Sequence, residues 1–163
     1  MSRRIAPGPG QESVWDYPRP PRIEAEPATL RITFAGQEIA RTSAAHRVLE
    51  TSHPPVYYLP REAFAPGVLV PAEGTSVCEW KGRARYFDVV MGGRRAPRAG
   101  WSYPDPTPAF AALRDHVAIY PAAMDGCFVG SERVRPQPGR FYGGWITDRV
   151  VGPFKGEPGT EGW

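Results

Sequence analysis

Residues 50–53, with the sequence Glu-Thr-Ser-His, place a carboxylate, two hydroxyls and an imidazole next to each other in the chain. An imidazole can act as an acid or a base near neutral pH, and a nearby carboxylate can orient it. Pro54 and Pro55 follow and exclude a helix here, and residues three apart on a strand point to opposite faces. Glu50 and His53 can therefore act together only where the chain turns between them. A hydrogen-bonded turn with a structural histidine is the alternative interpretation.

Lysine is rare in this sequence, and both lysines stand between an aromatic residue and a glycine, at residues 80–82 and 154–156. Apart from the histidines, every other basic residue is an arginine. Unlike arginine, lysine is a compact point charge whose pKa shifts readily on burial. Lys81 is therefore a candidate to hold an anionic group, with Lys155 as a second anion contact. The competing interpretation is that two lysines occur by chance.

Aromatic residues recur in short motifs with proline or glycine, at residues 56–58, 101–106 and 141–145. Phenol and indole rings combine flat apolar area with a polar tip, which suits the wall of a small-molecule pocket, although such rings also build ordinary cores. Cys78 is either a nucleophile with His53 as its base or a buried apolar thiol. The sequence thus predicts catalytic roles for Glu50, His53 and Lys81, and substrate-binding roles for Tyr57, Cys78, Trp101, Tyr103, Tyr142, Trp145 and Lys155.

The sequence lacks the common motifs for binding phosphates or dinucleotides and for serine hydrolysis. There is no P-loop, no Rossmann glycine pattern and no G-x-S-x-G elbow. Cys78 and Cys127 are far apart in the chain, neither belongs to a C-x-x-C pair, and only three histidines accompany them. We therefore expect neither a metal site nor a cofactor.

Short strands must position these residues, because the many prolines leave little room for long helices. Leu30, Ile32 and Phe34 alternate with polar residues, a pattern typical of a half-buried strand. Further strands are predicted at residues 38–42, 47–51, 56–59, 83–90, 117–120, 127–129, 132–134 and 141–147 and near Val150, with a helical turn at 60–64 and a two-residue hairpin turn at Gly130-Ser131. The only predicted helix runs from an N-cap at Thr107 to about His116.

The chain has 163 residues, of which 41% are hydrophobic, 12% are aromatic and 20 are prolines. This composition is typical of a turn-rich globular protein, and the length suits one domain with a real core. Residues 1–22 are predicted to form a Pro/Gly-rich arm that docks on the body through Trp15 and Tyr17. Residues 23–163 are predicted to form a single, compact, mainly β domain of short antiparallel strands with one short helix.

The formal net charge is +3, and the basic residues are spread along the chain without a run typical of a nucleic-acid-binding tail. The expected partner is therefore a small-molecule ligand rather than nucleic acid, and a homodimer stays open. No apolar signal segment follows Arg3 and Arg4, and no stretch is long enough to span a membrane. We expect a cytoplasmic protein with no membrane partner and with reduced cysteines.

Five motifs, taken in order, resemble a bacterial family known as domain of unknown function 427. They are residues 50–58 (ETSHPPVYY), 78–82 (CEWKG), 101–104 (WSYP), 141–145 (FYGGW) and 152–156 (GPFKG), and the resemblance runs from about Ser13 to the C-terminus. It implies a compact β-complex fold of the Mss4-like type, here without the metal-binding cysteine pairs. The family is also grouped as nucleotidyltransferase-like. Glu132 alone follows the Gly130-Ser131 turn, so a two-metal carboxylate cluster does not carry over to this chain.

Two functions are compatible with these residues. The first is a small-molecule enzyme with metal-independent acid/base chemistry by Glu50 and His53, in an aromatic-lined pocket where Lys81 contacts an anionic group. The alternative is a non-catalytic module that binds a small anion or a nucleotide with the same residues. A third function, as an interaction protein for RNA or a protein partner, is disfavoured by the scattered charge.

Overall fold

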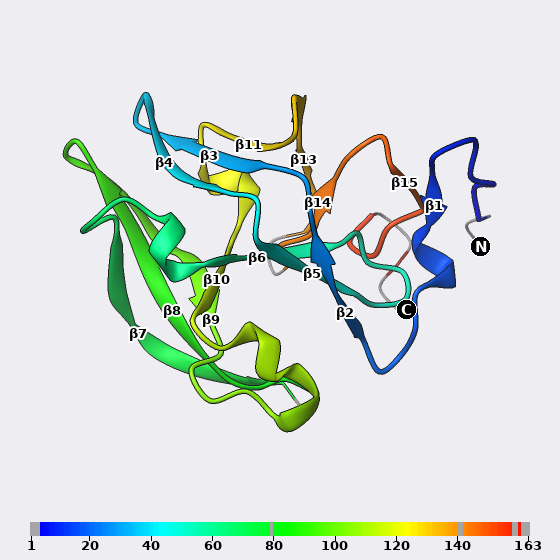
Figure 1. The fold of residues 1–163 in the computed structure, drawn as a ribbon, viewed down its shortest axis with the longest axis horizontal. Coiled ribbons are helices and arrows are strands. Elements are labelled where there is room, and N and C mark those ends of the chain that lie inside the picture. The colour runs from blue at the N-terminus through cyan, green and yellow to red at the C-terminus, as the bar shows by residue number, and fades with distance from the viewer. Residues whose placement is uncertain (1–3, 79, 140–141, 158–159, 161–163) are drawn as a thin grey trace.

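A computed structural model of the chain describes residues 4–78, 80–139, 142–157 and 160. Two antiparallel sheets and two short strand pairs make up the fold (Figure 1). The larger sheet has the strand order β2-β5-β6-β10-β9-β8-β7, and the smaller one has the order β12-β11-β3-β4. The mainly β, antiparallel fold predicted from the sequence is confirmed.

The strands of the larger sheet are β2 (Arg22–Glu26), β5 (Ala45–Leu49), β6 (Val56–Pro60), β7 (Leu69–Cys78), β8 (Gly82–Met91), β9 (Arg94–Ser102) and β10 (His116–Ile119). The smaller sheet contains β3 (Leu30–Phe34), β4 (Gln37–Thr42), β11 (Gly126–Val129) and β12 (Glu132–Arg133). The short pairs are β1 (Glu12–Ser13) with β15 (Val150–Val151), which is parallel, and β13 (Arg135–Pro136) with β14 (Trp145–Ile146). The described 3-10 helices are η1 (Val14–Asp16), η2 (Arg61–Ala63), η3 (Pro108–Leu113) and η4 (Pro121–Ala123). Among the residues that the structure describes, no helix is long and apolar enough to cross a membrane.

The alternation of residues 30–34 decides how β3 packs. Leu30, Ile32 and Phe34 are buried, whereas Arg31 and Thr33 are only half-buried. β3 pairs with β4 and β11, and its buried face joins the main hydrophobic cluster, to which both sheets contribute. Burying each such side chain stabilises the fold by about 1.5–3 kcal/mol.

Most other predicted strands match the structure within two residues at each end. The Gly130-Ser131 hairpin is confirmed, because Val129 of β11 pairs with Glu132 of β12. The strand predicted at 141–147 is the exception: Phe141 lies outside the described residues, and β14 covers only Trp145–Ile146.

Strands β7, β8 and β9 form two long consecutive hairpins along one side of the molecule (Figure 1). The sequence predicts β8 but neither of its neighbours. β7 is an edge strand that contains Pro71 and Gly74, and β9 contains Pro97 and Gly100. Proline and glycine are depleted in strands, so they hide the strand pattern in the sequence.

The helix predicted from Thr107 to His116 is shorter and more tightly wound than expected. The structure has the 3-10 helix η3 (Pro108–Leu113), with a kink at Phe110, and His116 begins β10. Thr107 precedes the helix, but its hydroxyl donates to a backbone carbonyl outside the helix instead of capping it. Phe110 and Leu113 are both buried, and their spacing of three fits the three-residue turn of a 3-10 helix.

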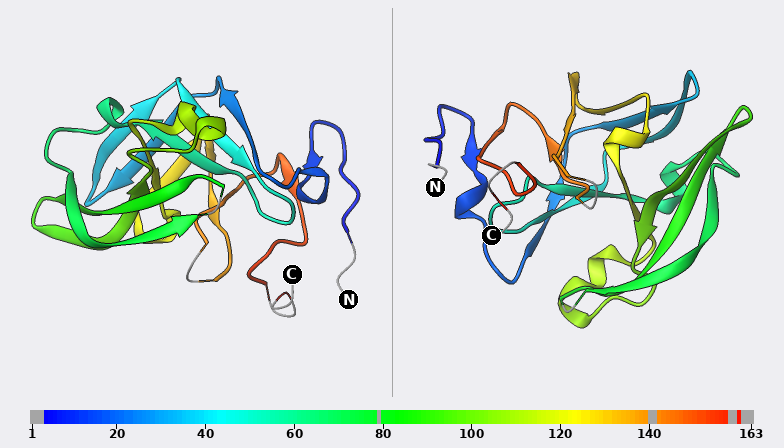
Figure 2. Two further views of the ribbon diagram at one scale, coloured as in Figure 1. Left: turned by 90° about the horizontal axis from the view of Figure 1, so that it is seen from below. Right: turned by 180° about the vertical axis from the view of Figure 1, so that it is seen from behind.

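The N-terminal segment lies against the C-terminal part of the chain. β1 pairs with β15, and Trp15 Nε1 donates to the Pro153 carbonyl at 3.0 Å. Val14 and Tyr17 are buried in a third hydrophobic cluster that includes Leu49. Figure 2 shows the N-terminal segment beside the segment that follows β14.

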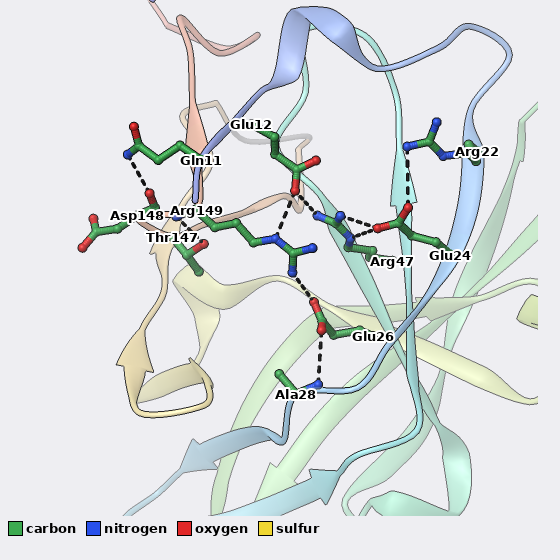
Figure 3. Close-up of polar contacts among 10 residues, drawn as sticks. All are labelled: Gln11, Glu12, Arg22, Glu24, Glu26, Ala28, Arg47, Thr147, Asp148 and Arg149. Atoms are coloured by element: carbon green, nitrogen blue, oxygen red, sulfur yellow. Dashed lines mark hydrogen bonds and ion pairs between the residues drawn. The ribbon is translucent and has the colours of Figure 1, made fainter. Parts of the chain in front are cut away.

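A network of ion pairs joins these segments to the larger sheet (Figure 3). Arg47 of β5 has a side chain that is only 4% exposed, and its guanidinium binds Glu12 of β1 at 2.8 Å and Glu24 of β2 at 2.6 Å. Arg149 binds Glu12 at 3.0 Å and Glu26 at 2.8 Å. Both arginines share the Glu12 carboxylate, which therefore links β1 to β5 and to the segment before β15.

Candidate functional site

A pocket of about 230 Å³ lies where strands β6 to β10 meet Gln137, Tyr142 and Gly143. Six tyrosine and tryptophan residues line it: Tyr58, Tyr86, Trp101, Tyr103, Tyr120 and Tyr142. Four polar side chains also line it: His53, Ser76, Lys81 and Gln137. Val56, Ala84 and Gly143 complete the described lining.

Strand pairing positions the aromatic wall. Tyr86 of β8 lies opposite Trp101 of β9, and Trp101 lies opposite Ala118 of β10, so these side chains share one face of the sheet. Trp101 Nε1 donates to the Tyr58 hydroxyl at 3.2 Å, and the two rings meet edge to face with their centroids 6.2 Å apart. Tyr58 accepts this hydrogen bond, and its own O–H is engaged by the hydroxyl of Tyr103, with which it shares a side-chain hydrogen bond.

Gly143 lets the backbone at residues 142–143 close the wall. A Cβ at Gly143 would overlap the ring of Trp101, so the backbone can approach this closely only at a glycine. The ring of Tyr142 packs 5.6 Å from the ring of His53, measured between centroids. Gly143 therefore contacts the sheet, and Tyr142 contacts the turn that carries His53.

The buried tyrosine hydroxyls of the pocket are neutral. Burial raises the pKa of Tyr58 well above its usual value of 10.0, and burial is also the largest cause of the raised pKa of Tyr103. Burial raises the pKa of Tyr120 as well. These hydroxyls therefore stay protonated at neutral pH and carry no negative charge.

The chain turns sharply between Glu50 and His53. β5 ends at Leu49, two residues before the predicted end of this strand, and Ser52 adopts a positive φ of 71°. The His53 N–H donates to the Glu50 carbonyl at 3.0 Å and closes the turn. The turn brings His53 to the pocket, whereas the Glu50 carboxylate pairs with Arg19 at 3.9 Å.

Gln137 determines which nitrogen of the His53 ring carries the proton. Its side chain is buried, Oε1 accepts the Gly144 N–H at 3.1 Å, and Nε2 donates to the Lys155 carbonyl at 2.8 Å. These two contacts set the orientation of the amide, so the second Nε2 hydrogen is left for His53 Nδ1, which is 3.2 Å away. Nδ1 is therefore an acceptor, and the neutral ring carries its proton on Nε2.

The His53 imidazole is held in its neutral form. Burial lowers its pKa below the usual 6.5, the Glu50 carboxylate opposes this shift, and nearby cations, among them Lys81, lower the pKa further. The hydrogen bond from Gln137 acts in the same direction as burial, because Nδ1 can accept it only when unprotonated. At neutral pH, His53 therefore offers an Nε2–H donor, and its Nδ1 is already engaged.

Lys81 reaches the pocket from the turn between β7 and β8. Gly82 has a φ of 112°, and a Cβ there would lie 3.2 Å from the Asp105 carbonyl oxygen, so the turn requires a glycine. The Lys81 carbonyl accepts the Thr107 N–H at 3.1 Å, which ties this turn to the segment before η3. The Lys81 ammonium lies 5.8 Å from the centre of the Tyr103 ring and so forms a cation–π contact.

The predicted site residues that line the pocket are His53, Lys81, Trp101, Tyr103 and Tyr142. Tyr57 and Trp145 instead pack together in the main core, with ring centroids 5.1 Å apart. Successive residues on β6 point to opposite faces, so Tyr57 faces the core while Tyr58 faces the pocket. Burial in this core raises the pKa of Tyr57 to about 12.

Glu50, Cys78 and Lys155 do not line the pocket. Cys78 is half-buried and packs against the second hydrophobic cluster, which also contains Tyr103. Lys155 Nζ donates to the Thr160 carbonyl at 3.0 Å. Glu50 and Lys155 affect the pocket through their charges, because both act on the pKa of His53.

Sequence patterns do not single out several residues that the structure places in the lining. Ser76 and Tyr86 share a hydrogen bond of 2.7 Å between their hydroxyls, across β7 and β8. Tyr86 and Tyr120 lie in predicted strands, but alternation alone does not tell which face of a strand meets a pocket. Gln137 stands between two prolines in a segment without periodicity, so no signal in the sequence marks it.

The described lining offers hydrogen-bond donors and one full positive charge, from Lys81, and contains no carboxylate. Within the ranges that the structure describes, no group of three or more His, Cys, Asp or Glu residues is placed to hold a metal ion. Donors and a cation can hold an anion, or stabilise negative charge on an oxygen atom. Proton abstraction is less suited to this pocket, because Gln137 engages the free nitrogen of His53.

The comparison with protein families agrees with the motifs of the sequence. The family model described as a domain of unknown function (DUF427) matches residues 22–130, which is more than half of the chain. The match includes His53, Lys81 and Trp101 and ends before Gln137 and Tyr142. No curated protein matches the sequence. The chain therefore belongs to the DUF427 family.

Proposed function

We propose that the pocket binds a small organic anion with a flat apolar part. The composition of the described lining carries this proposal: Lys81, the Nε2–H of His53 and the tyrosine hydroxyls supply donors, and no carboxylate opposes them. A cation attracts an anion most strongly where no acidic side chain neutralises it. The aromatic wall supports a flat partner, because rings pack well against planar groups.

The size of the pocket limits the ligand. Pockets for drug-sized molecules occupy roughly 300–1,000 Å³. The volume here is about 230 Å³, which favours a molecule with a single substituted ring. A whole nucleotide would extend beyond the pocket, so this proposal favours a smaller anion.

A second candidate is a metal-independent enzyme that uses the same pocket. The observation in its favour is the fixed Nε2–H donor of His53, in a lining that also contains Lys81. An imidazole N–H and an ammonium can stabilise negative charge that develops on a carbonyl oxygen, and the imidazole can then release its proton as a general acid. Glu50 would influence this chemistry through its charge, because its carboxylate pairs with Arg19.

We also infer a cytoplasmic setting, which the two free cysteines support. Burial raises the pKa of the Cys127 thiol to about 12, so this cysteine stays protonated and unreactive. A small-molecule ligand is the partner that the proposal requires, and it requires neither nucleic acid nor a second copy of the chain.

Benzoate and phenyl phosphate are suitable first probes, titrated calorimetrically into wild type and Lys81→Ala. A hydrogen bond to a charged group contributes about 1.5–3 kcal/mol, so the substitution should weaken binding roughly 10- to 100-fold. Arg83→Ala is the matched control. It also removes one positive charge near the start of β8. Arg83, however, is exposed, and its side chain lies on the other face of β8 from Ala84, which lines the pocket.

Equal affinities in wild type and a folded Lys81→Ala variant would contradict the proposal. Phenyl acetate, an ester of similar size, separates the two candidate functions. Hydrolysis of phenyl acetate that His53→Gln abolishes would favour the enzyme. Saturable binding of the probes without any hydrolysis of the ester would favour the binding module.

A further inference from the structure

Arg98 of β9 lies beside the pocket wall, outside the set of residues that line it. Its guanidinium carbon is 4.2 Å from the centre of the Tyr86 ring, and Tyr86 lines the pocket. The Arg98 charge also acts on Tyr120, another lining residue, and favours a lower pKa there. Burial has the larger effect and raises the pKa of Tyr120 overall. Because Arg98 is exposed, it places a positive charge at the rim of the pocket, on the solvent side.

The backbone of Arg98 is held in an uncommon conformation. Its φ is 48°, in the left-handed region that is costly for a residue with a Cβ. Its N–H donates to Asp88 Oδ1 at 2.8 Å, close to the register shift between β8 and β9. Such conformations persist only where neighbouring groups hold them, and they are concentrated at functional sites.

Gly74 of β7 makes room for the Arg98 side chain. Gly74 has a φ of 93° and lies in the irregular part of β7, between Pro71 and Thr75. A Cβ at this position would lie 2.9 Å from Arg98 Nη1. The side chain therefore crosses from β9 over the Tyr86 ring to β7, and residues of three strands determine its position.

The Arg98 guanidinium forms no ion pair within the described part of the chain, whereas its neighbours do. Arg94 pairs with Asp125, and Arg95 pairs with Asp88. The hydrogen bond from Arg98 to Asp88 comes from the backbone N–H of Arg98, and Asp88 forms its ion pair with Arg95. The Arg98 charge is therefore available to a negative group that approaches from outside.

We propose that the ligand of the pocket carries a second acidic group, which Arg98 holds at the rim while Lys81 holds the first. This inference rests on the proposed function of the pocket. Lys81 immediately precedes β8, and Arg98 binds Asp88 near the other end of the same strand, with Tyr86 between them. A flat dianion, such as an aromatic ring with an acidic group at each end, would contact both cations and lay its ring against the aromatic wall.

Terephthalate and benzoate are matched probes, because they differ by one carboxylate on the same ring. An exposed ion pair contributes up to about 1 kcal/mol. Terephthalate has two equivalent carboxylates, which alone gives a statistical factor of two. Beyond this factor, terephthalate should bind wild type more tightly than benzoate by up to about fivefold. In Arg98→Gln this preference should disappear, while the affinity for benzoate stays the same. Arg98→Lys, which keeps the charge, should retain part of the preference.

Arg85→Gln is the matched control, since Arg85 is an exposed arginine next to Tyr86 on β8 that points to the other face of the sheet. This variant should keep the full preference for terephthalate. Two results would overturn the inference: wild type that binds both probes equally, or a preference for terephthalate that persists in Arg98→Gln. Neither result would contradict the proposed function, which rests on Lys81-dependent binding of benzoate. Wild type that binds neither probe would refute the proposed function, and this inference with it.

Discussion

Replacing Gln137 with leucine removes three side-chain hydrogen bonds and nearly conserves the volume of the side chain. The partners that lose a hydrogen bond are the Gly144 N–H, the Lys155 carbonyl and His53 Nδ1. A net hydrogen bond contributes about 1 kcal/mol, so Gln137→Leu should lower the free energy of unfolding by about 3 kcal/mol. Urea denaturation followed by tryptophan fluorescence measures this change.

The same substitution should change the protonation of His53. Without the Gln137 donor, the unprotonated Nδ1 loses its partner, so the pKa of His53 should rise toward its usual 6.5. In wild type the folded pKa lies below that of the unfolded chain, so the unfolded chain takes up the proton first as the pH falls below 6.5. This contribution to stability is therefore present above pH 6.5 and is lost progressively as the pH falls from 6.5 through the lower folded pKa, and the loss should be smaller in Gln137→Leu.

Nitrogen-15 NMR of the histidine rings tests the reasoning directly, and His53→Asn assigns the signal among the three histidines of the chain. Gln137→Glu is the matched control, because it keeps an acceptor for Gly144 but cannot donate to Nδ1 when ionised. A wild-type His53 that carries its proton on Nδ1 would refute the orientation argued for Gln137. A pKa of His53 at or above 6.5 in wild type would refute the argument from burial.

Two further substitutions test the close approach at the pocket wall and the ion network. Gly143→Ala should lower the free energy of unfolding by about 1–3 kcal/mol, because the new Cβ overlaps the Trp101 ring. Unchanged stability in urea would contradict this argument, because it would mean that the Trp101 ring moves aside without a loss of free energy. Arg47→Met should lower it by about 3 kcal/mol, since the carboxylates of Glu12 and Glu24 lose a shared buried partner. Thermal denaturation measures this second effect, and a loss below about 1 kcal/mol would show that Arg47 contributes no more than a surface ion pair.

The part of the fold that could be predicted is the part where one face of a strand is buried and the other is not. Leu30, Ile32 and Phe34 alternate with polar residues because β3 lies between a core and a more exposed face. β7 gives no such signal, because it is an edge strand with exposed residues on both faces and a register shift near Gly74. Strand propensity depends on this context, so an edge strand that contains proline and glycine is not predicted from its sequence pattern.

The candidate site was predictable only where a residue type is itself unusual. Lys81 stands out in a chain whose other cations are nearly all arginine, and His53 stands out beside Glu50 and two prolines. Tyr57 and Tyr58 are equivalent in the sequence, and only the direction of β6 assigns one to the core and the other to the pocket. Gln137 became visible only in the structure, because its role depends on long-range packing that brings residues 53, 137 and 155 together.

The shared Glu12 carboxylate has a consequence for how the molecule opens. Short terminal segments usually fray independently of the domain that carries them, at little free-energy cost. Here β1 cannot separate from β15 without breaking the ion pairs of Glu12 with Arg47 and Arg149. Arg47 belongs to β5, and Arg149 directly precedes β15. The amide hydrogens of β1 and β15 should therefore exchange as one cooperative unit.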